Sequence, residues 1–178
     1  MIGSGSEAGF RVHERFLDLE LPHEAVARTD HVAGGMMVSN DGSRLQISHA
    51  CVAVSTLSLH SVDSVPGVRT TDRDGIIPDV LHGLYNPVAT FRTEHLPLPA
   101  SAGEGQKQTV PVAGQFTISG VTKPVEVMVE GTIQGGQLQV VGSFPITLAD
   151  YGMSPPENPI AAVDSKAVVE FRLFLDHR

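Results

Sequence analysis

The stretch that decides the fold runs from Val110 to Ile146 and reads VPVAGQFTISGVTKPVEVMVEGTIQGGQLQVVGSFPI. Apolar and polar residues alternate through most of it, which is typical of strands with one buried face and one exposed face. Gly135-Gly136 is typical of a two-residue hairpin turn, because both central positions of a type I′ turn need a positive φ. We therefore predict antiparallel strands over Val125–Ile133 and Leu138–Ile146.

This turn also fixes the register of the predicted hairpin. Apolar residues then face apolar residues along one side, and each glycine faces a larger residue. A slip by one residue would place Phe144 among the glutamates, so the register is well specified. The expected cross-strand pairs are Ile133–Leu138, Gly131–Val140, Val129–Gly142, Val127–Phe144 and Val125–Ile146.

The rest of the chain has the same strand-rich character. A further strand is expected over Val110–Ile118, followed by a turn at Gly120–Pro124. Only Asp72–Leu84 is predicted to be helical, and Pro78 limits it to one or two short helices. The other expected strands are Phe10–Phe16, Ala25–Val38, Leu45–Leu57, Val88–Leu96 and Val168–Leu175.

About eight antiparallel strands with so little helix define an all-β fold. The lack of helices also limits how the sheet can bury its apolar face. No helical layer is available to cover the apolar face, so the sheet must fold over into a sandwich or close into a barrel. The length of 178 residues corresponds to a single domain, 1–178. We expect its core at about 7–176, with flexible segments at 1–6 and 97–108.

Composition excludes several classes of function. Twelve Lys and Arg against 20 Asp and Glu give a net charge of −8, which repels phosphate backbones, so no nucleic-acid partner is expected. The single cysteine, Cys51, excludes an intrachain disulfide. No apolar run reaches the roughly 18 residues of a transmembrane segment.

The first ten residues, MIGSGSEAGF, lack the basic and apolar parts of a signal peptide. A cytoplasmic protein is expected if nothing precedes them. An exported or cell-envelope protein is expected if a leader does.

No motif indicates catalysis or metal binding. The eight histidines form no H-x-H or H-E-x-x-H pattern, which favours surface or turn positions over metal ligands. No serine lies in a G-x-S-x-G elbow. A small hydrolase using Asp74, His82 or Asp150 remains an alternative, although no nucleophile–base pair is visible. We therefore expect no catalytic residue, no metal and no required cofactor.

Two polar turns are expected to have structural roles. Arg73-Asp74, within TTDRDG, is interpreted either as a solvated turn in which the aspartate caps a short helix, or as a fixed ion pair at a barrel mouth. In ADYGMSPP, Asp150 is expected to accept backbone hydrogen bonds and Gly152 to take a positive φ.

Five segments, taken in order, resemble the YceI-like domain family. They are AVARTDHVAGG, TTDRDG, NPVATF, GQFTISGVTKPVEV and GSFPITLADYGMSPP. The actinobacterial branch of that family carries similar segments, such as YPTATF, LTLHGVTRPV and ITFADYGI. The resemblance covers about Glu7 to Leu175. One departure is Asn86, which stands where the family usually has a tyrosine before the proline.

The resemblance implies a lipocalin-like antiparallel barrel with an elongated apolar lumen, and a function in binding polyisoprenoid chains or isoprenoid quinones without catalysis. It also places Arg73-Asp74 near one end of the barrel. The expected partner is a small apolar ligand, with a homodimer left open. On the apolar phase of each strand, the residues expected to line the lumen are Val52, Val54, Phe91, Phe116, Ile118, Val127, Val129, Val140 and Phe171.

A ligand-free barrel that serves a structural or partner-binding role is the competing hypothesis. Seven Phe and two Tyr are enough aromatic residues to fill a small barrel. The interior volume distinguishes the two hypotheses, because ligand pockets usually measure about 300–1,000 Å³.

Overall fold

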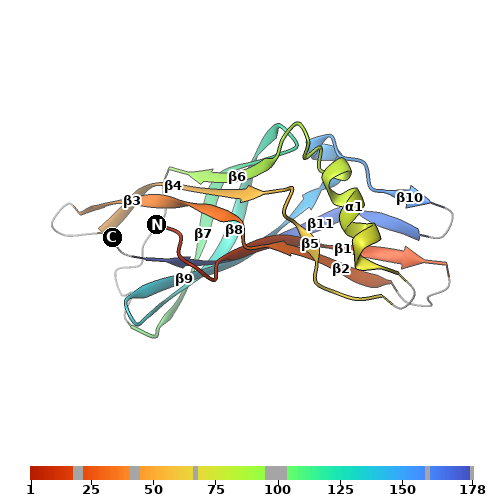
Figure 1. Cartoon of the computed structure of the whole chain (residues 1–178). Coiled ribbons are helices and arrows are strands. Elements are labelled where there is room, and N and C mark those ends of the chain that lie inside the picture. Colours follow the sequence, from red (N-terminus) through yellow and green to blue (C-terminus); the bar gives the residue numbers. More distant parts are fainter. Residues whose placement is uncertain (18–21, 41–44, 66–67, 95–103, 159–160, 177–178) are drawn as a thin grey trace.

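The computed structural model of this protein describes residues 1–17, 22–40, 45–65, 68–94, 104–158 and 161–176. Within these ranges, eleven strands form one sheet with antiparallel strand pairs, and one α-helix lies near one end of it (Figure 1). The elements are β1 (Glu7–Phe16), β2 (His23–Thr29), β3 (Val32–Asn40), β4 (Leu45–Ser55), β5 (His60–Ser61), α1 (Thr70–Val80), β6 (Val88–Thr93), β7 (Lys107–Ile118), β8 (Val121–Gln134), β9 (Gln137–Thr147), η1 (Leu148–Tyr151), β10 (Glu157–Asn158) and β11 (Ala161–Leu175).

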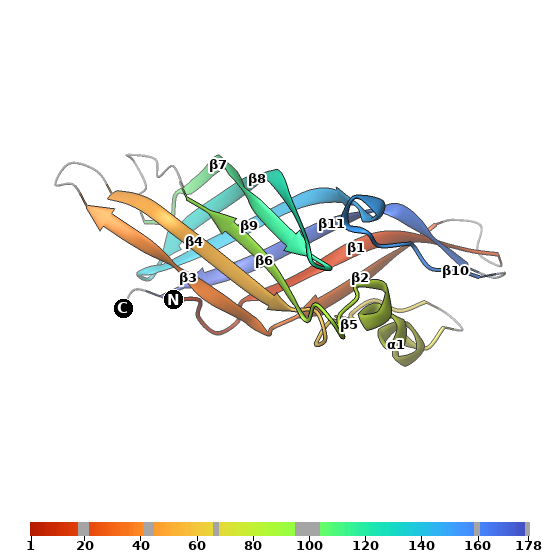
Figure 2. The ribbon, with the colours of Figure 1, turned by 90° about the horizontal axis from the view of Figure 1, so that it is seen from above.

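The sheet is an open, curled half-barrel. Ten strands follow the order β3-β4-β6-β7-β8-β9-β11-β1-β2-β5, and β10 pairs with β11. The sheet curls so that β3, β4 and β6 lie across from β11, β1 and β2 (Figures 1 and 2). Its end strands, β3 and β5, form no ladder with each other in the described part of the chain. The prediction of an all-β antiparallel sheet is confirmed, whereas full closure of the barrel is not observed.

The number of strands is eleven and not about eight. Two of the additional strands, β5 and β10, are only two residues long and carry too little pattern to be recognised. The third arises because the predicted strand Ala25–Val38 breaks at Asp30-His31 into β2 and β3. After this break the chain leaves β1 and pairs with β4 instead, so β2 and β3 lie near opposite ends of the sheet order.

The hairpin at Gly135-Gly136 forms in the predicted register. Both glycines have positive φ, 59° and 78°. The pairs Ile133–Leu138, Gly131–Val140 and Val129–Gly142 are confirmed. The ladder ends at Met128–Ser143, so the two remaining expected pairs, Val127–Phe144 and Val125–Ile146, lie beyond it.

The predicted turn at Gly120–Pro124 is wrong in its position. The turn residues are Ser119 and Gly120, with φ of 53° and 77°, and β8 begins directly after them. The Ser119 hydroxyl donates a hydrogen bond to the Leu81 carbonyl at 2.8 Å, which helps to hold this uncommon conformation. Pro124 lies inside β8 but before the start of the ladder to β9. The N–H group that proline lacks is therefore not needed for a hydrogen bond to β9.

The helix is also more continuous than predicted. Pro78 lies inside α1, which spans Thr70–Val80 as one element. Because Pro78 is in the last turn, few hydrogen bonds of the helix follow it, and the helix ends at Val80, with Leu81 as its C-cap.

The N-terminal residues bridge two strands that are not neighbours in the sheet. The sequence predicts flexibility at 1–6, but Ile2 forms a bridge with Leu175 of β11 and donates its N–H to the Gly34 carbonyl of β3 at 3.2 Å. Gly3 donates to the Phe174 carbonyl at 2.6 Å. Within the second segment predicted to be flexible, residues 97–103 lie outside the described residues, and 107–108 begin β7.

The Gly135-Gly136 turn can be tested by alanine substitution. No atom lies within 4 Å of a Cβ added at Gly136, so Gly136→Ala probes the positive φ alone and should lower the free energy of unfolding by about 1–2 kcal/mol. Gly75 of α1 has equally open surroundings but no positive φ, and Gly75→Ala should instead raise it by about 0.5–1 kcal/mol. Urea unfolding of both variants measures these changes. Equal effects of the two substitutions would contradict the turn assignment.

Candidate functional site

Two apolar cavities adjoin inside the curled sheet. The first, which we call the α1-end cavity, measures about 130 Å³ and lies between α1, β1, β2 and β11. The second, the β3-end cavity, measures about 120 Å³ and lies between β3, β4, β6, β9 and β11. Their walls share residues from five strands, so the two cavities meet inside the sheet. The shared residues are Ala8, Val54, Ala89, Phe116 and Val169.

Eight of the nine residues expected to line a lumen lie on these walls. The exception is Val127, which is buried in the core, with 1% of its surface exposed, and lines neither cavity. The wall of the α1-end cavity includes Val54, Phe116 and Ile118. The wall of the β3-end cavity includes Val52, Val54, Phe91, Phe116, Val129, Val140 and Phe171.

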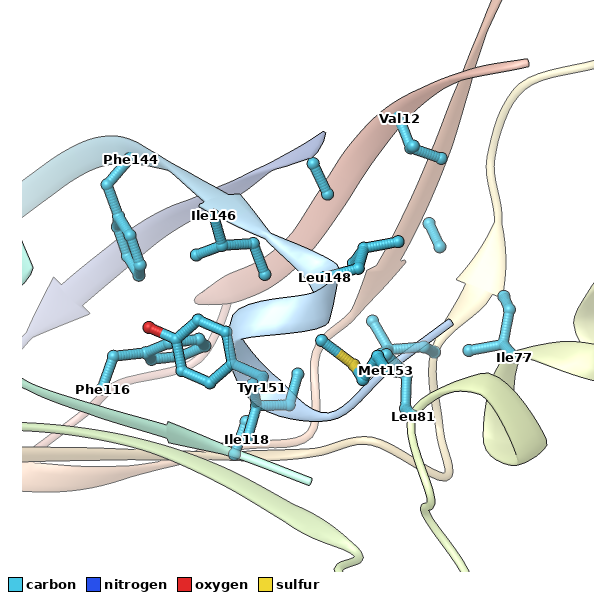
Figure 3. Close-up of a cluster of buried hydrophobic side chains, with 14 of the residues drawn as sticks. Val12, Ile77, Leu81, Phe116, Ile118, Phe144, Ile146, Leu148, Tyr151 and Met153 are labelled. Carbon is cyan, nitrogen blue, oxygen red and sulfur yellow. The ribbon is translucent and has the colours of Figure 1, made fainter. Parts of the chain in front are cut away.

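An aromatic cluster lies where the cavities meet. The ring of Phe116 contacts Phe144 edge-on, with centroids 5.0 Å apart, and Tyr151 at 5.6 Å (Figure 3). Tyr151 is held there by η1, which ends at Gly152 with a φ of 71°. Burial raises the pKa of the Tyr151 hydroxyl, so this group stays neutral at ordinary pH. These rings fill the centre of the interior and limit its free volume.

Charged residues occur at the other end of the α1-end cavity. Along β1, the side chains of Ala8, Val12 and Glu14 all line this cavity, so Glu14 continues an apolar row. Glu14 pairs in register with His23 of β2. Arg73 of α1 lines the same cavity, and its side chain is 11% exposed.

Asp63 contacts both Arg73 and His23 of this cluster. Its carboxylate accepts two hydrogen bonds from the Arg73 guanidinium, at 2.7 and 3.2 Å, and one from the N–H of Val26 at 2.8 Å. The Nε2 atom of His23 lies 2.7 Å from the same carboxylate. Burial by itself would raise the pKa of Asp63, but the hydrogen bonds outweigh it and lower the pKa to about 2. Asp63 is therefore ionised and fully engaged.

Glu14 has a different environment from Asp63. Its Oε2 atom is buried, lies 3.6 Å from Nη2 of Arg73 and has no hydrogen-bond partner among the described residues. Burial raises the pKa of Glu14, the Arg73 charge opposes this shift, and the nearby Asp63 charge adds to it. One polar atom on the cavity wall thus remains unsatisfied.

The predicted roles of Arg73 and Asp74 need correction. Asp74 does not cap α1, because the helix begins earlier, at Thr70, and Asp74 lies inside it. Its carboxylate instead accepts the N–H of Ser61 at 2.7 Å and so ties α1 to β5. Arg73 pairs with Asp63 and Glu14 and not with its neighbour in sequence, because successive side chains of a helix point in different directions.

Asp150, expected to accept backbone hydrogen bonds, is exposed and lies 3.9 Å from Nζ of Lys123. In the part of the chain that the structure describes, no hydrogen bond joins Asp74, His82 and Asp150 to one another. No group of three or more His, Cys, Asp or Glu residues there could hold a metal ion. Over the same ranges, no helix has the length and apolar character that a membrane span requires.

Sequence reasoning missed three of the four ionisable residues at this end, namely Glu14, His23 and Asp63. One signal was available in the sequence. In the predicted strand Phe10–Phe16, Glu14 lies on the same face as Phe10 and Val12, where the alternation calls for an apolar residue. The approach of Asp63 and Arg73 to that position depends on where α1 packs, which no local pattern encodes.

A curled antiparallel sheet around a narrow apolar interior, with a charged group at one end, defines a class of small-ligand-binding β-proteins. Residues 4–175 match the YceI-like domain, and the chain belongs to this family. A search of the curated proteins finds no match.

Solved structures show the same fold. A polyisoprenoid binding domain from Saccharophagus degradans, implicated in plant cell wall breakdown, is 15% identical with a TM-score of 0.68, covering 99% of this chain and all of the other. BcnA of Burkholderia cenocepacia is 18% identical with a TM-score of 0.60, covering 93% and 95% of the two chains. The Campylobacter jejuni YceI protein is 12% identical with a TM-score of 0.56, covering 93% and 84%. At these identities the likeness concerns the fold alone.

The role of Asp63 predicts how stability changes with pH. Its pKa is about 2 in the folded protein, whereas an unfolded aspartate titrates near 3.9. The carboxylate therefore stabilises the fold fully above about pH 4, and this contribution is lost as the pH falls through 2. Asp63→Asn should cost about 1–2 kcal/mol at neutral pH, and its difference from wild type should shrink between about pH 4 and 2.

Urea unfolding at a series of pH values measures this difference. Asp30→Asn is a suitable control, because the Asp30 side chain is 84% exposed and its ion pair with His31 is long, at 3.8 Å. A difference between wild type and Asp63→Asn that does not change with pH would show that the ionised carboxylate is not the stabilising group.

Proposed function

We propose that this protein binds a long apolar ligand, a polyisoprenoid or an isoprenoid quinone, inside the curled sheet and catalyses no reaction on it. The observation that carries the proposal is the pair of adjoining cavities, whose walls are formed almost entirely by apolar side chains. Membership of the YceI-like family supports it, as does the similar fold of a polyisoprenoid binding domain. No cofactor is needed for such a function.

Burial of the ligand supplies enough free energy for this function. Each CH₂ group removed from water contributes about 0.8 kcal/mol, so one isoprene unit contributes roughly 3–4 kcal/mol. Immobilising the ligand costs about 4–15 kcal/mol, and a few units exceed that cost. Since the gain depends on area and not on directed bonds, apolar walls suffice and no polar motif is required.

The size of the cavities favours a slim ligand. Each cavity is smaller than the roughly 300 Å³ of an ordinary small-molecule pocket. An isoprenoid chain is narrow and extends across both cavities, which meet at Phe116 and Ala8. The ends of the half-barrel, β3 and β5, are not paired with each other in the described residues, so widening the interior breaks no ladder between them.

The same small volume also favours the second candidate function, a ligand-free barrel with a structural or partner-binding role. In that case the aromatic cluster is simply the core, and the two cavities are ordinary packing voids. Binding measurements separate these candidates, as described below.

We further propose that the chain belongs to the actinobacterial branch of the family. The segments AVARTDHVAGG and GSFPITLADYGMSPP, with their spacing, support this assignment.

A charge on the cavity wall should abolish binding. Val129 is buried on the wall of the β3-end cavity, and Val129→Glu places an unpaired carboxylate there at a cost of several kcal/mol. Met128 is the neighbouring residue of the same strand but is 54% exposed, so Met128→Glu is a matched control. We expect a long-chain isoprenoid quinone to co-elute with wild type and Met128→Glu in gel filtration, and not with Val129→Glu.

Circular dichroism checks that each variant is folded. Val129→Phe, which fills the same cavity without a charge, gives a second test and should also reduce binding. Equal quinone retention by wild type and a folded Val129→Glu protein would contradict the proposal. Absence of quinone binding to wild type would favour the ligand-free barrel.

A further inference from the structure

The unsatisfied carboxylate oxygen of Glu14 is the feature of this interior that packing does not explain. Glu14 ends the row of β1 side chains that begins with Ala8 and Val12 on the wall of the α1-end cavity. Its side chain is only 13% exposed, and Oε2 has no hydrogen-bond partner in the part of the chain that the structure describes. A buried charged acceptor without a partner is costly, and native proteins rarely keep one without a use.

Arg73 does not satisfy this oxygen. Its guanidinium donates two hydrogen bonds to Asp63, at 2.7 and 3.2 Å, whereas Nη2 lies 3.6 Å from Glu14 Oε2, beyond hydrogen-bond reach. The guanidinium is thus held in a fixed orientation by a different carboxylate. Glu14 lines the cavity and keeps one buried oxygen without a donor and with only partial charge compensation.

We propose that Glu14 accepts a hydrogen bond from the head group of the bound ligand, and that the preferred ligand is therefore a long-chain isoprenoid with a neutral hydroxyl. This inference rests on the proposed function, because it requires the apolar chain of the ligand to occupy the α1-end cavity. The hydroxyl supplies the donor that Oε2 lacks, and the apolar chain continues along the row formed by Val12 and Ala8.

The charges at this end argue against an anionic head group. Two carboxylates, Glu14 and Asp63, lie beside one guanidinium, with His23 as the remaining titratable group. Since Asp63 takes both hydrogen bonds from Arg73, a phosphate would meet the repulsion of two carboxylates without displacing either. An ether or a quinone carbonyl offers no donor to Glu14 and gains nothing from it.

Three ligands with the same chain test the inference on the full protein: a polyprenol, its methyl ether and its diphosphate. A hydrogen bond to a carboxylate is stronger than one between neutral groups, so the alcohol should bind roughly 10-fold or more tighter than the ether. The diphosphate should bind more weakly than the alcohol. Competition against a bound fluorescent fatty chain measures all three affinities.

Substitutions of Glu14 test whether this residue causes the preference for the alcohol over the ether. Glu14→Leu should bring the ratio of alcohol to ether affinity to about 1 while the ether still binds, an effect that a merely structural role of Glu14 would not produce. Glu24→Gln is the control, because Glu24 is exposed on β2 and pairs with Arg11, and it should keep the wild-type ratio. If Glu14→Leu does not fold, Glu14→Gln provides the test. It should lower the ratio of alcohol to ether affinity several-fold, because the acceptor of glutamine is uncharged.

The possible failures are distinguishable. Equal affinity of wild type for the alcohol and the ether, or tighter binding of the diphosphate, would overturn the inference and leave the proposed function standing. An unchanged ratio in Glu14→Gln would also overturn it. Failure of all three ligands to bind would overturn both the inference and the proposed function.

Discussion

The apolar face of a single antiparallel sheet has no partner layer in this protein, and this constraint shapes the rest of the structure. The face is buried only because the sheet curls over, so that the walls of both cavities combine side chains from β4 with side chains from β11. The helix α1 lies at one end of the sheet (Figure 2), and side chains of α1 and of the short η1 element line the α1-end cavity. A narrow apolar interior is a direct consequence of this arrangement.

Packing and binding make opposite demands on that interior. Phe116, Phe144 and Tyr151 interlock at its centre and supply core packing, which stabilises the curl. The adjoining cavities are where this packing is incomplete, and incomplete packing costs stability unless a ligand fills the space. The polar cluster of Glu14, His23, Asp63 and Arg73 lies at one end of this interior, so the two ends are chemically different.

Sequence patterns predict the central hairpin well because the residues that determine its turn and register lie close together in the sequence. Gly135-Gly136 sets the turn, and the alternation around Val129 sets the buried face. The break at Asp30-His31 was missed because both flanking segments are apolar and strand-like, and the change of partner from β1 to β4 depends on distant strands. Arg73 was recognised as notable, but its partner Asp63 was not, since that contact depends on the packing of α1.

The central claim is that the interior holds a long apolar molecule, and native mass spectrometry of the intact protein tests it most directly. Purified protein, incubated with a polyprenol and passed through gel filtration, is sprayed under non-denaturing conditions and then extracted with organic solvent. We expect a species heavier than the 18.9 kDa chain by one ligand, which disappears on denaturation while the ligand is recovered in the extract. A spectrum that shows only the free chain after incubation would contradict the central claim.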